Sequence, residues 1–177
     1  MGIDPGTNLL GYAVLDIAQS RLHVVEIGVI KMAHLFSHQL KLKCIFEKLQ
    51  TLIERHHPTE LAIEAPFFGK NVQSMLKLGR AQGVAMAAGL TKGLIISEYS
   101  PKKVKQSITG NGNASKEQVA AMLQHILKVE LKAHTFDATD ALAVALCHHY
   151  QSNRTTGGKK RYSNWSSYLK DHPDKLQ

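Results

Sequence analysis

The sequence of 177 residues opens with Gly2-Ile3-Asp4-Pro5-Gly6-Thr7, and this stretch is the starting point for deducing the fold. Asp4 stands at the end of a short apolar run, directly before a turn. Residues 61–66 (LAIEAP) repeat this arrangement, with Glu64 at the end of a second apolar run. Both stretches are typical of short strands. The sequence therefore predicts two strands that each end at a carboxylate.

Two further carboxylates lie late in the sequence. Asp137 and Asp140 are three positions apart in residues 136–146 (FDATDALAVAL), which predict a helix. Residues at i and i+3 lie on one face of a helix, so the two side chains can approach the same place. If they meet Asp4 and Glu64, four like charges share a small volume, which is tolerated only when divalent cations neutralise them.

The order of the periodic segments predicts a mixed sheet flanked by helices. Strands are expected at about residues 1–4, 11–17, 23–32, 61–64 and 94–99, and helices at about 40–55, 71–91, 101–108, from Ser115 onward, and 136–150. Three successive strands followed by alternating helices and strands are typical of a layered α/β domain. We expect one such domain over residues 1–150, with Asp4 and Glu64 at neighbouring strand ends.

The charge of the chain favours a polyanionic partner. Lys plus Arg is 22 against 14 acids, a net charge of +8 at pH 7. Nucleic acid is one explanation of this excess, and simple solubility is the other. Residues 151–177 hold six Lys or Arg and two Asp, a net of +4, which is half of the excess. This polar stretch predicts a flexible basic tail, either an arm that follows phosphates or a solvated end.

Other features of the composition predict a cytoplasmic protein. The two cysteines, Cys44 and Cys147, lie in apolar helical stretches and are expected as core thiols in a reducing compartment. No apolar run approaches the ~20 residues of a membrane span, and no secretion signal opens the sequence. The ten histidines, with pairs at 56–57 and 148–149, show no metal-site spacing and are interpreted as surface or helix-end residues.

Several motifs occur in a fixed order along residues 2–150. They are residues 2–7 with Gly11-Tyr12, residues 62–64 with Phe67 and Lys70-Asn71, residues 76–85 (LKLGRAQGVA), residues 104–106 (VKQ) and residues 137–143 (DATDALA). In this order and spacing they resemble the RuvC family of bacterial Holliday junction resolvases, within the ribonuclease H-like superfamily. The resemblance implies an α/β fold, with a ribonuclease H-like mixed five-stranded sheet flanked by helices.

The resemblance also implies a function. It implies a homodimeric endonuclease that cuts four-way DNA junctions by paired nicks, with two Mg²⁺ ions per subunit or Mn²⁺ in their place. The implied catalytic residues and metal ligands are Asp4, Glu64, Asp137 and Asp140. In-line attack of water on a phosphodiester suits this set, because two hard cations about 4 Å apart can activate the water and stabilise the leaving oxygen. The RuvAB branch-migration complex is implied as a partner.

Contacts to DNA are implied at six positions, which are Phe67, Lys70, Lys77, Arg80, Lys105 and Lys116. Phe67 matches the family's base-contacting aromatic and would stack on a base unpaired near the crossover, whereas Phe68 is expected in the core. Lys105 and Lys116 match positions that face the DNA backbone near the scissile phosphate. The other cations are further candidates for phosphate binding. A solvated surface is the alternative for each lysine.

Small residues crowd the helix expected at residues 71–91, namely Gly79, Ala81, Gly83, Ala85, Ala87, Ala88 and Gly89. They allow a second helix to approach closely. In the family this helix forms much of the dimer interface, and packing on its own sheet is the alternative. The sequence departs from the family at its start, where only Met1 precedes Gly2. We expect either a trimmed chain or a frayed edge at the site.

Other interpretations stay open at this point. Taken singly, Asp4 can be a turn former, Glu64 a surface acid at a strand end and Asp137 a charge that stabilises a helix start. A strand followed by an Asp, Gly and Thr turn also suits phosphate binding in sugar kinases and actin-like ATPases, although those folds generally need two such domains. A protein that binds junctions without cutting them is a further alternative, distinguished by whether the acids bind metal.

Overall fold

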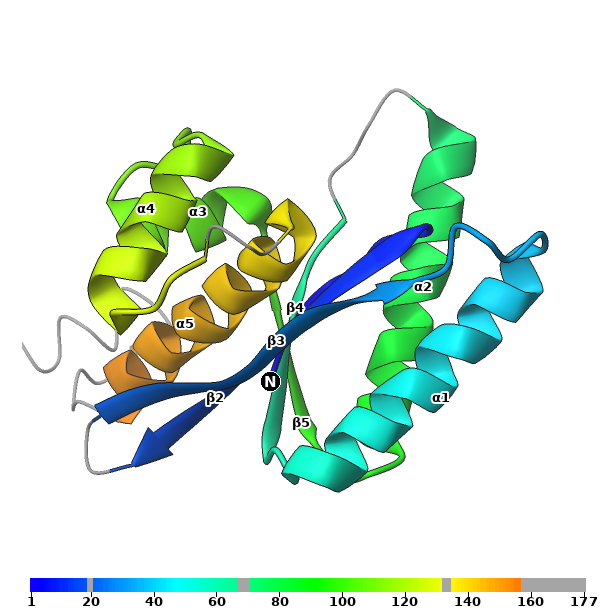
Figure 1. The fold of residues 1–177 in the computed structure, drawn as a ribbon, viewed down its shortest axis with the longest axis horizontal. Helices are drawn as coiled ribbons and strands as arrows, with labels where there is room; N and C mark the ends of the chain where they lie inside the picture. The colour runs from blue at the N-terminus through cyan, green and yellow to red at the C-terminus, as the bar shows by residue number, and fades with distance from the viewer. Residues whose placement is uncertain (19–20, 67–70, 132–134, 157–177) are drawn as a thin grey trace, which may run out of the picture.

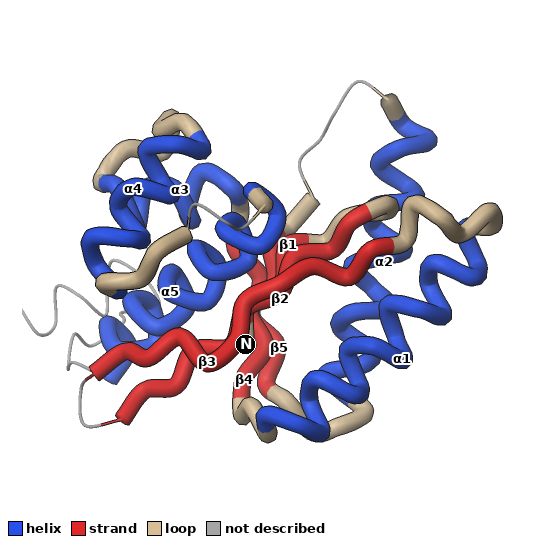
Figure 2. The backbone as a smooth tube through the Cα atoms, in the orientation of Figure 1, coloured by secondary structure: helices blue, strands red, loops and turns tan. Residues whose placement is uncertain are grey.

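A five-stranded mixed sheet crosses the molecule, and helices cover both of its faces (Figure 1, Figure 2). The structure is a computed structural model that describes residues 1–18, 21–66, 71–131 and 135–156. Its strands are β1 (Gly2–Asp4), β2 (Leu9–Ala18), β3 (Arg21–Lys31), β4 (Glu60–Glu64) and β5 (Ile95–Tyr99). Its helices are α1 (His38–His56), α2 (Val72–Leu90), α3 (Pro101–Thr109), α4 (Lys116–Leu127) and α5 (Phe136–Thr156).

The strands lie in the order β3-β2-β1-β4-β5. The first three pair antiparallel as a meander, whereas β1 pairs parallel with β4 and β4 pairs parallel with β5. The expected mixed sheet is therefore confirmed. Although β1 has only three residues, it is central and paired on both sides, and Ile3 within it is fully buried. The expectation of a frayed strand at this position is wrong.

The register of β1 and β4 brings the first two acids together. Ile3 lies opposite Ile63 in the parallel pair, so Asp4 and Glu64 are the next residues at the same end of neighbouring strands. The carboxyl ends of parallel strands meet at one edge of a sheet, and side chains there project toward the same space. The placement that the sequence predicted for these two acids is confirmed.

Each face of the sheet carries its own apolar core. On one face, Ile3 and Ile63 pack with α1 and α2, and on the other, Ala13 and Ala62 pack with α3, α4 and α5. Figure 1 shows the two groups of helices on opposite sides of the strands. Cys147 is buried in the second core and Cys44 is half-buried, and both thiols are free.

Two glycines allow α5 to lie unusually close to the sheet. A Cβ atom at Gly2 would stand 2.3 Å from the backbone oxygen of Ala141, and one at Gly11 would stand 1.9 Å from that of Asp137. Real Cβ atoms do not approach other atoms this closely. The absence of a side chain at Gly2 on β1 and at Gly11 on β2 therefore sets how close the first turns of α5 lie to the sheet.

The helix starts follow the sequence signals, whereas the last helix ends later than expected. Ser115 caps α4 in a capping box with Gln118, and Ser100 caps α3 ahead of Pro101. We expected the last helix to end near Tyr150, but α5 continues to Thr156. The polar residues 151–156 contain no helix breaker. The first helix breaker after Tyr150 is the glycine pair at 157–158. Residues 157–177, most of the predicted tail, lie outside the described residues.

None of the helices in the described part of the chain is both long enough and apolar enough to cross a lipid bilayer.

The close packing of α5 makes a testable prediction. Gly11→Ala should destabilise the protein by about 1–3 kcal/mol, because the new methyl group overpacks the contact between β2 and α5. Chemical denaturation measures this change. Ile17→Ala is the control, since Ile17 is half exposed on the same strand and its truncation should cost within about 0.5 kcal/mol. A Gly11→Ala protein as stable as the wild type would show that the close contact does not constrain α5.

Candidate active site

Three of the predicted acids converge on one cavity. Asp4 at the end of β1, Glu64 at the end of β4 and Asp140 on α5 all line a cavity of about 220 Å³. Lys105 of α3 and Lys116 of α4 line it too. Five elements that are distant in the sequence therefore place three carboxylates and two cations around a single small volume.

The fourth predicted acid, Asp137, stands at the side of this cavity. It is half-buried in the first turn of α5 and does not line the cavity. Its charge nevertheless acts on both Asp4 and Lys116. The structure thus brings Asp4, Glu64 and Asp140 together and leaves Asp137 as a neighbour that adds negative charge.

Lys116 neutralises part of this negative charge. Its ammonium group donates a hydrogen bond to Asp140 in an ion pair and lies 5.9 Å from the centre of the Phe136 ring. Burial lowers the pKa of Lys116, but the hydrogen bond to Asp140 and the charges of Asp140, Asp4 and Asp137 raise it by more. Lys116 therefore stays charged at the cavity wall.

The two lysines at the cavity do not balance its acids. Burial first, and then the charges of Glu64 and Asp140, raise the pKa of Asp4 to about 8. Burial and the charge of Asp140 raise the pKa of Glu64 to about 7, against the opposing effect of Lys116 and Lys105. Both carboxyls therefore keep their protons to a higher pH than usual, because burial and the neighbouring carboxylates outweigh the effect of the two lysines.

The donor set fits a hard divalent cation. Among the described residues, no three acid, histidine or cysteine side chains already stand in an arrangement that would hold a metal ion. Asp4, Glu64 and Asp140 nevertheless offer desolvated carboxylate oxygens from three elements with too little positive charge between them, and such oxygens are the ligands of Mg²⁺, Ca²⁺ and Mn²⁺. A cation bound there would take over the role of Lys116 toward Asp140.

The remaining predicted contact residues divide into two groups. Lys77 and Arg80 are exposed on α2, on the face of the sheet opposite to α3, α4 and α5. Phe67 and Lys70, together with Phe68, lie outside the described residues.

Comparison with known proteins identifies the family and the fold. The family described as "Crossover junction endodeoxyribonuclease RuvC" matches residues 1–148. The chain belongs to the RuvC family. This is a family of metal-dependent nucleases, in agreement with the chemistry of the acid cavity.

Bacterial relatives match the whole chain. The RuvC endonuclease of Cytophaga hutchinsonii is 53% identical over 177 residues, which cover 100% of this chain and 87% of the relative. That of Christiangramia forsetii is 51% identical, with 100% and 92% covered. The structure of Thermus thermophilus RuvC in complex with a Holliday junction substrate has a TM-score of 0.81 and 29% identity, and the match covers 88% of this chain and 94% of that one. The predicted family and fold class are confirmed.

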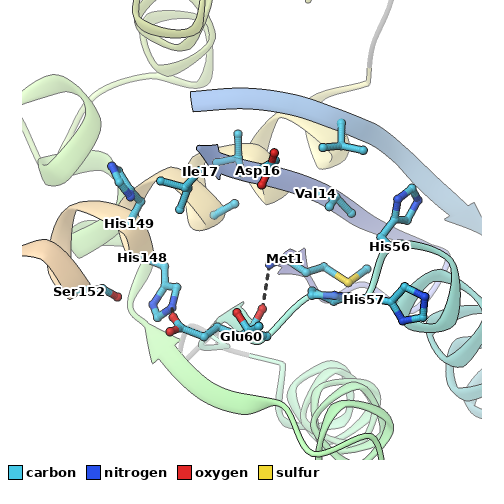
Figure 3. Close-up of a pocket in the computed structure, with 15 residues that line it drawn as sticks. Met1, Val14, Asp16, Ile17, His56, His57, Glu60, His148, His149 and Ser152 are labelled. Atoms are coloured by element: carbon cyan, nitrogen blue, oxygen red, sulfur yellow. Dashed lines mark hydrogen bonds and ion pairs between the residues drawn. The ribbon is translucent and has the colours of Figure 1, made fainter. Parts of the chain in front are cut away.

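A larger cavity lies at the other end of β1 and lacks the chemistry of a RuvC active site. It has a volume of about 510 Å³ and is lined by Met1 and Glu60 together with His148, among others (Figure 3). Met1 donates to the backbone oxygen of Glu60 through its terminal amine. Size alone would favour this cavity, but the three carboxylates predicted from the sequence line the smaller one.

His148 has a role that the sequence analysis missed. Its Nδ1 atom is 2.7 Å from the Tyr99 hydroxyl, and its Nε2 atom is hydrogen-bonded to the Glu60 carboxylate. It thereby ties α5 to β4 and β5. Its interpretation as a surface or helix-end residue is wrong, because α5 continues beyond it. Periodicity could have found this, since His148 falls on the apolar face that includes Val144.

The raised pKa values predict how the metal-free protein responds to pH. Because folding raises the pKa of Asp4 from 3.8 to about 8, its contribution to stability is complete below about pH 4 and is lost as pH rises through 8. The unfolding temperature in a chelating buffer should therefore fall between pH 5 and 9 by several degrees, and less in Asp4→Asn. Thermal unfolding followed by circular dichroism measures this.

Asp16→Asn is the matched control, because it makes the same chemical change at an exposed position on β2. Its pH profile should follow that of the wild type. Identical profiles for Asp4→Asn and the wild type would contradict the electrostatic account of the cavity.

Proposed function

We propose that the chain is a crossover junction endodeoxyribonuclease, which resolves four-way (Holliday) DNA junctions by paired nicks in recombination and DNA repair. The observation that carries this proposal is the convergence of Asp4, Glu64 and Asp140 on one cavity in a chain of the RuvC family. Relatives that are about half identical over the whole chain bear that enzyme's name. A similar solved structure holds a Holliday junction substrate.

The metal that we propose is Mg²⁺, with two ions per subunit and Mn²⁺ as a substitute. Asp4, Glu64 and Asp140 would hold it, and Asp137 is a further proposed ligand. Mg²⁺ suits such a site because it prefers carboxylate oxygens and keeps several of its water molecules. When bound, the metal supplies an activated water and stabilises the charge on the leaving oxygen.

The chain's own residues meet the other needs of phosphodiester cleavage. Asp4 and Glu64 must lose their protons before they can bind a cation, and their raised pKa values make that loss depend on pH near neutrality. Lys105 and Lys116 stand at the wall of the same cavity and would bind the scissile phosphate. Lys116 can exchange its carboxylate partner Asp140 for a phosphate oxygen, since both accept the same charged hydrogen bond.

Contacts to the rest of the junction are proposed from the family resemblance. Lys77 and Arg80 on α2 are exposed and would bind backbone phosphates. Phe67 would stack on an unpaired base near the crossover, and Lys70 would bind a phosphate beside it. Residues 1–150 would form the nuclease domain and residues 151–177 a basic tail. We also propose a cytoplasmic location and the RuvAB branch-migration complex as a partner.

A homodimer is the assembly that we propose, with α2 at its interface. The small residues of this helix fall on two faces. Ala81, Ala85 and Ala88 are buried against the protein's own core, whereas Gly79 and Gly83 face open space. The two glycines share their helix with exposed apolar side chains, namely Val72, Leu76 and Leu90.

An apolar face of this kind with glycines at i and i+4 suits close contact with the same helix of a second copy. A two-fold dimer would also present two equivalent cavities to a junction that offers two symmetric cleavage sites. The alternative, in which the small residues serve only internal packing, applies to Ala81, Ala85, Ala88 and Gly89, which are buried.

Junction cleavage tests the proposed activity. The wild type with Mg²⁺ should make paired nicks near the crossover of a labelled synthetic four-way junction and leave a matched duplex intact. Asp4→Asn, Glu64→Gln and Asp140→Asn should each cut at least about 10³-fold more slowly, because each removes a charge that holds the metal. All three should still bind the junction, and the exposed Asp16→Asn should cut normally.

Retained cleavage in any of the three variants would contradict the assignment of that acid. Binding without cleavage by the wild type would favour a junction-binding protein that is not an enzyme. A wild type that neither binds nor cuts the junction would overturn the proposed function.

Sedimentation tests the proposed dimer. The wild type should sediment as a dimer at micromolar concentration, and Leu76→Asp should sediment as a monomer, because it places a charge on the apolar face of α2. Ile17→Asp is the matched control, since both side chains are 51% exposed and Ile17 lies on β2, away from α2. A monomeric wild type, or a dimeric Leu76→Asp protein, would contradict the proposed interface.

A further inference from the structure

Four basic side chains gather where α1 and α2 begin. His38 and Lys41 lie on the first two turns of α1. Burial first, and then the charges of Arg80, Lys77 and Lys41, lower the pKa of the His38 ring. We call these four residues the α1–α2 cation cluster. Both helices start at the end of the sheet where β1 ends at Asp4 (Figure 1).

Little negative charge is available to this cluster within its own helices. Neither α1 nor α2 has an acidic residue in its first turn, and α2 has none along its whole length. Lys77 and Arg80 are exposed, and Lys41 is half-buried. Like charges that remain this close cost free energy, and an anion from outside the chain would relieve that cost.

His38 adds a second observation that points to a ligand. Its Nε2 atom is buried and has no hydrogen-bond partner among the described residues. A buried polar atom without a partner is unfavourable, and a phosphate oxygen is an acceptor that this nitrogen can use when it carries a proton. Just ahead of the helix, the Phe36 side chain is completely exposed. Exposed aromatic rings beside cations are typical of surfaces that bind nucleic acids.

The cluster is connected to the acid cavity through Lys41. Its ammonium group donates a hydrogen bond to Asn8 Oδ1 at 2.6 Å, and Asn8 lies in the loop that follows Asp4. Lys105 and Lys116 flank the acids from the helices on one face of the sheet. The α1–α2 cation cluster lies at the same end of the sheet, on the helices of the other face (Figure 1). A DNA strand that crosses the cavity would meet cations on both sides of the acids.

We propose that His38 and Lys41, together with Lys77 and Arg80, bind backbone phosphates of one junction arm beside the acid cavity. This inference rests on the proposed function and adds α1 to the DNA-binding surface. The contacts are to phosphate, so they position the arm without reading its sequence. His38 and Lys41 thereby become binding residues in addition to those that the family resemblance implies.

Salt-dependent binding tests the inference. The dissociation constant of a labelled four-way junction is measured in Ca²⁺ over a series of salt concentrations, for the wild type and for a His38→Gln/Lys41→Gln protein. The double variant should bind about three- to tenfold more weakly near 0.1 M salt, and the slope of log K against log salt should become shallower by about 1, because Lys41 no longer displaces a counterion. Each single variant should show part of the effect.

Three controls separate phosphate binding from structural effects. Lys43→Gln removes a charge from the same helix, where Lys43 is exposed and pairs with Glu47 at 3.6 Å, and should bind as the wild type does. Asn8→Ala removes the hydrogen bond of Lys41 but keeps its charge, so the salt slope should persist. Lys41→Arg should restore the wild-type slope, and thermal unfolding confirms that each variant is folded.

A double variant with wild-type affinity and slope would overturn the inference, provided that the wild type binds and cuts the junction. Loss of affinity with an unchanged slope, or loss of the dimer in sedimentation, would also overturn it, because neither result reflects phosphate contacts. A wild type that does not bind junctions would overturn the proposed function, and this inference with it.

Discussion

The close contact between α5 and the sheet is the constraint on which the candidate active site depends. Gly2 and Gly11 present no side chains to α5, so its backbone at Ala141 and Asp137 passes where a methyl group would not fit. The first turns of α5 are thereby held beside the end of β1, and Asp140 reaches the cavity that Asp4 and Glu64 line. A larger residue at either glycine would move the helix and its acids together.

This packing creates an electrostatic problem that the protein solves only in part. Carboxylates from three elements share a volume of about 220 Å³, and burial makes their charges more costly than they would be in water. Lys116 compensates for Asp140, while Asp4 and Glu64 retain raised pKa values. A site of this kind trades stability of the metal-free protein for affinity toward a cation. Strained or unbalanced groups of this sort are common at functional sites.

Much of the fold was predictable because it follows from local patterns. Alternation and apolar runs predicted all five strands, and the capping residues Ser115 and Gln118 predicted the start of α4. The position of Asp4 and Glu64 at neighbouring strand ends also followed from the order of elements. The end of α5 was placed too early, because polar residues without a breaker neither favour nor forbid a further turn.

The sequence by itself determined most of the elements and the family to which the chain belongs, and it singled out four candidate acids, because these depend on residue types and spacing along the chain. Only the tertiary structure decided that Asp137 stands beside the cavity rather than in its wall, that Lys116 pairs with Asp140, and that His148 joins three elements. It also brought His38 near Lys77, across two helices. Contacts between residues far apart in sequence depend on how the helices and strands pack. No local sequence pattern encodes that packing.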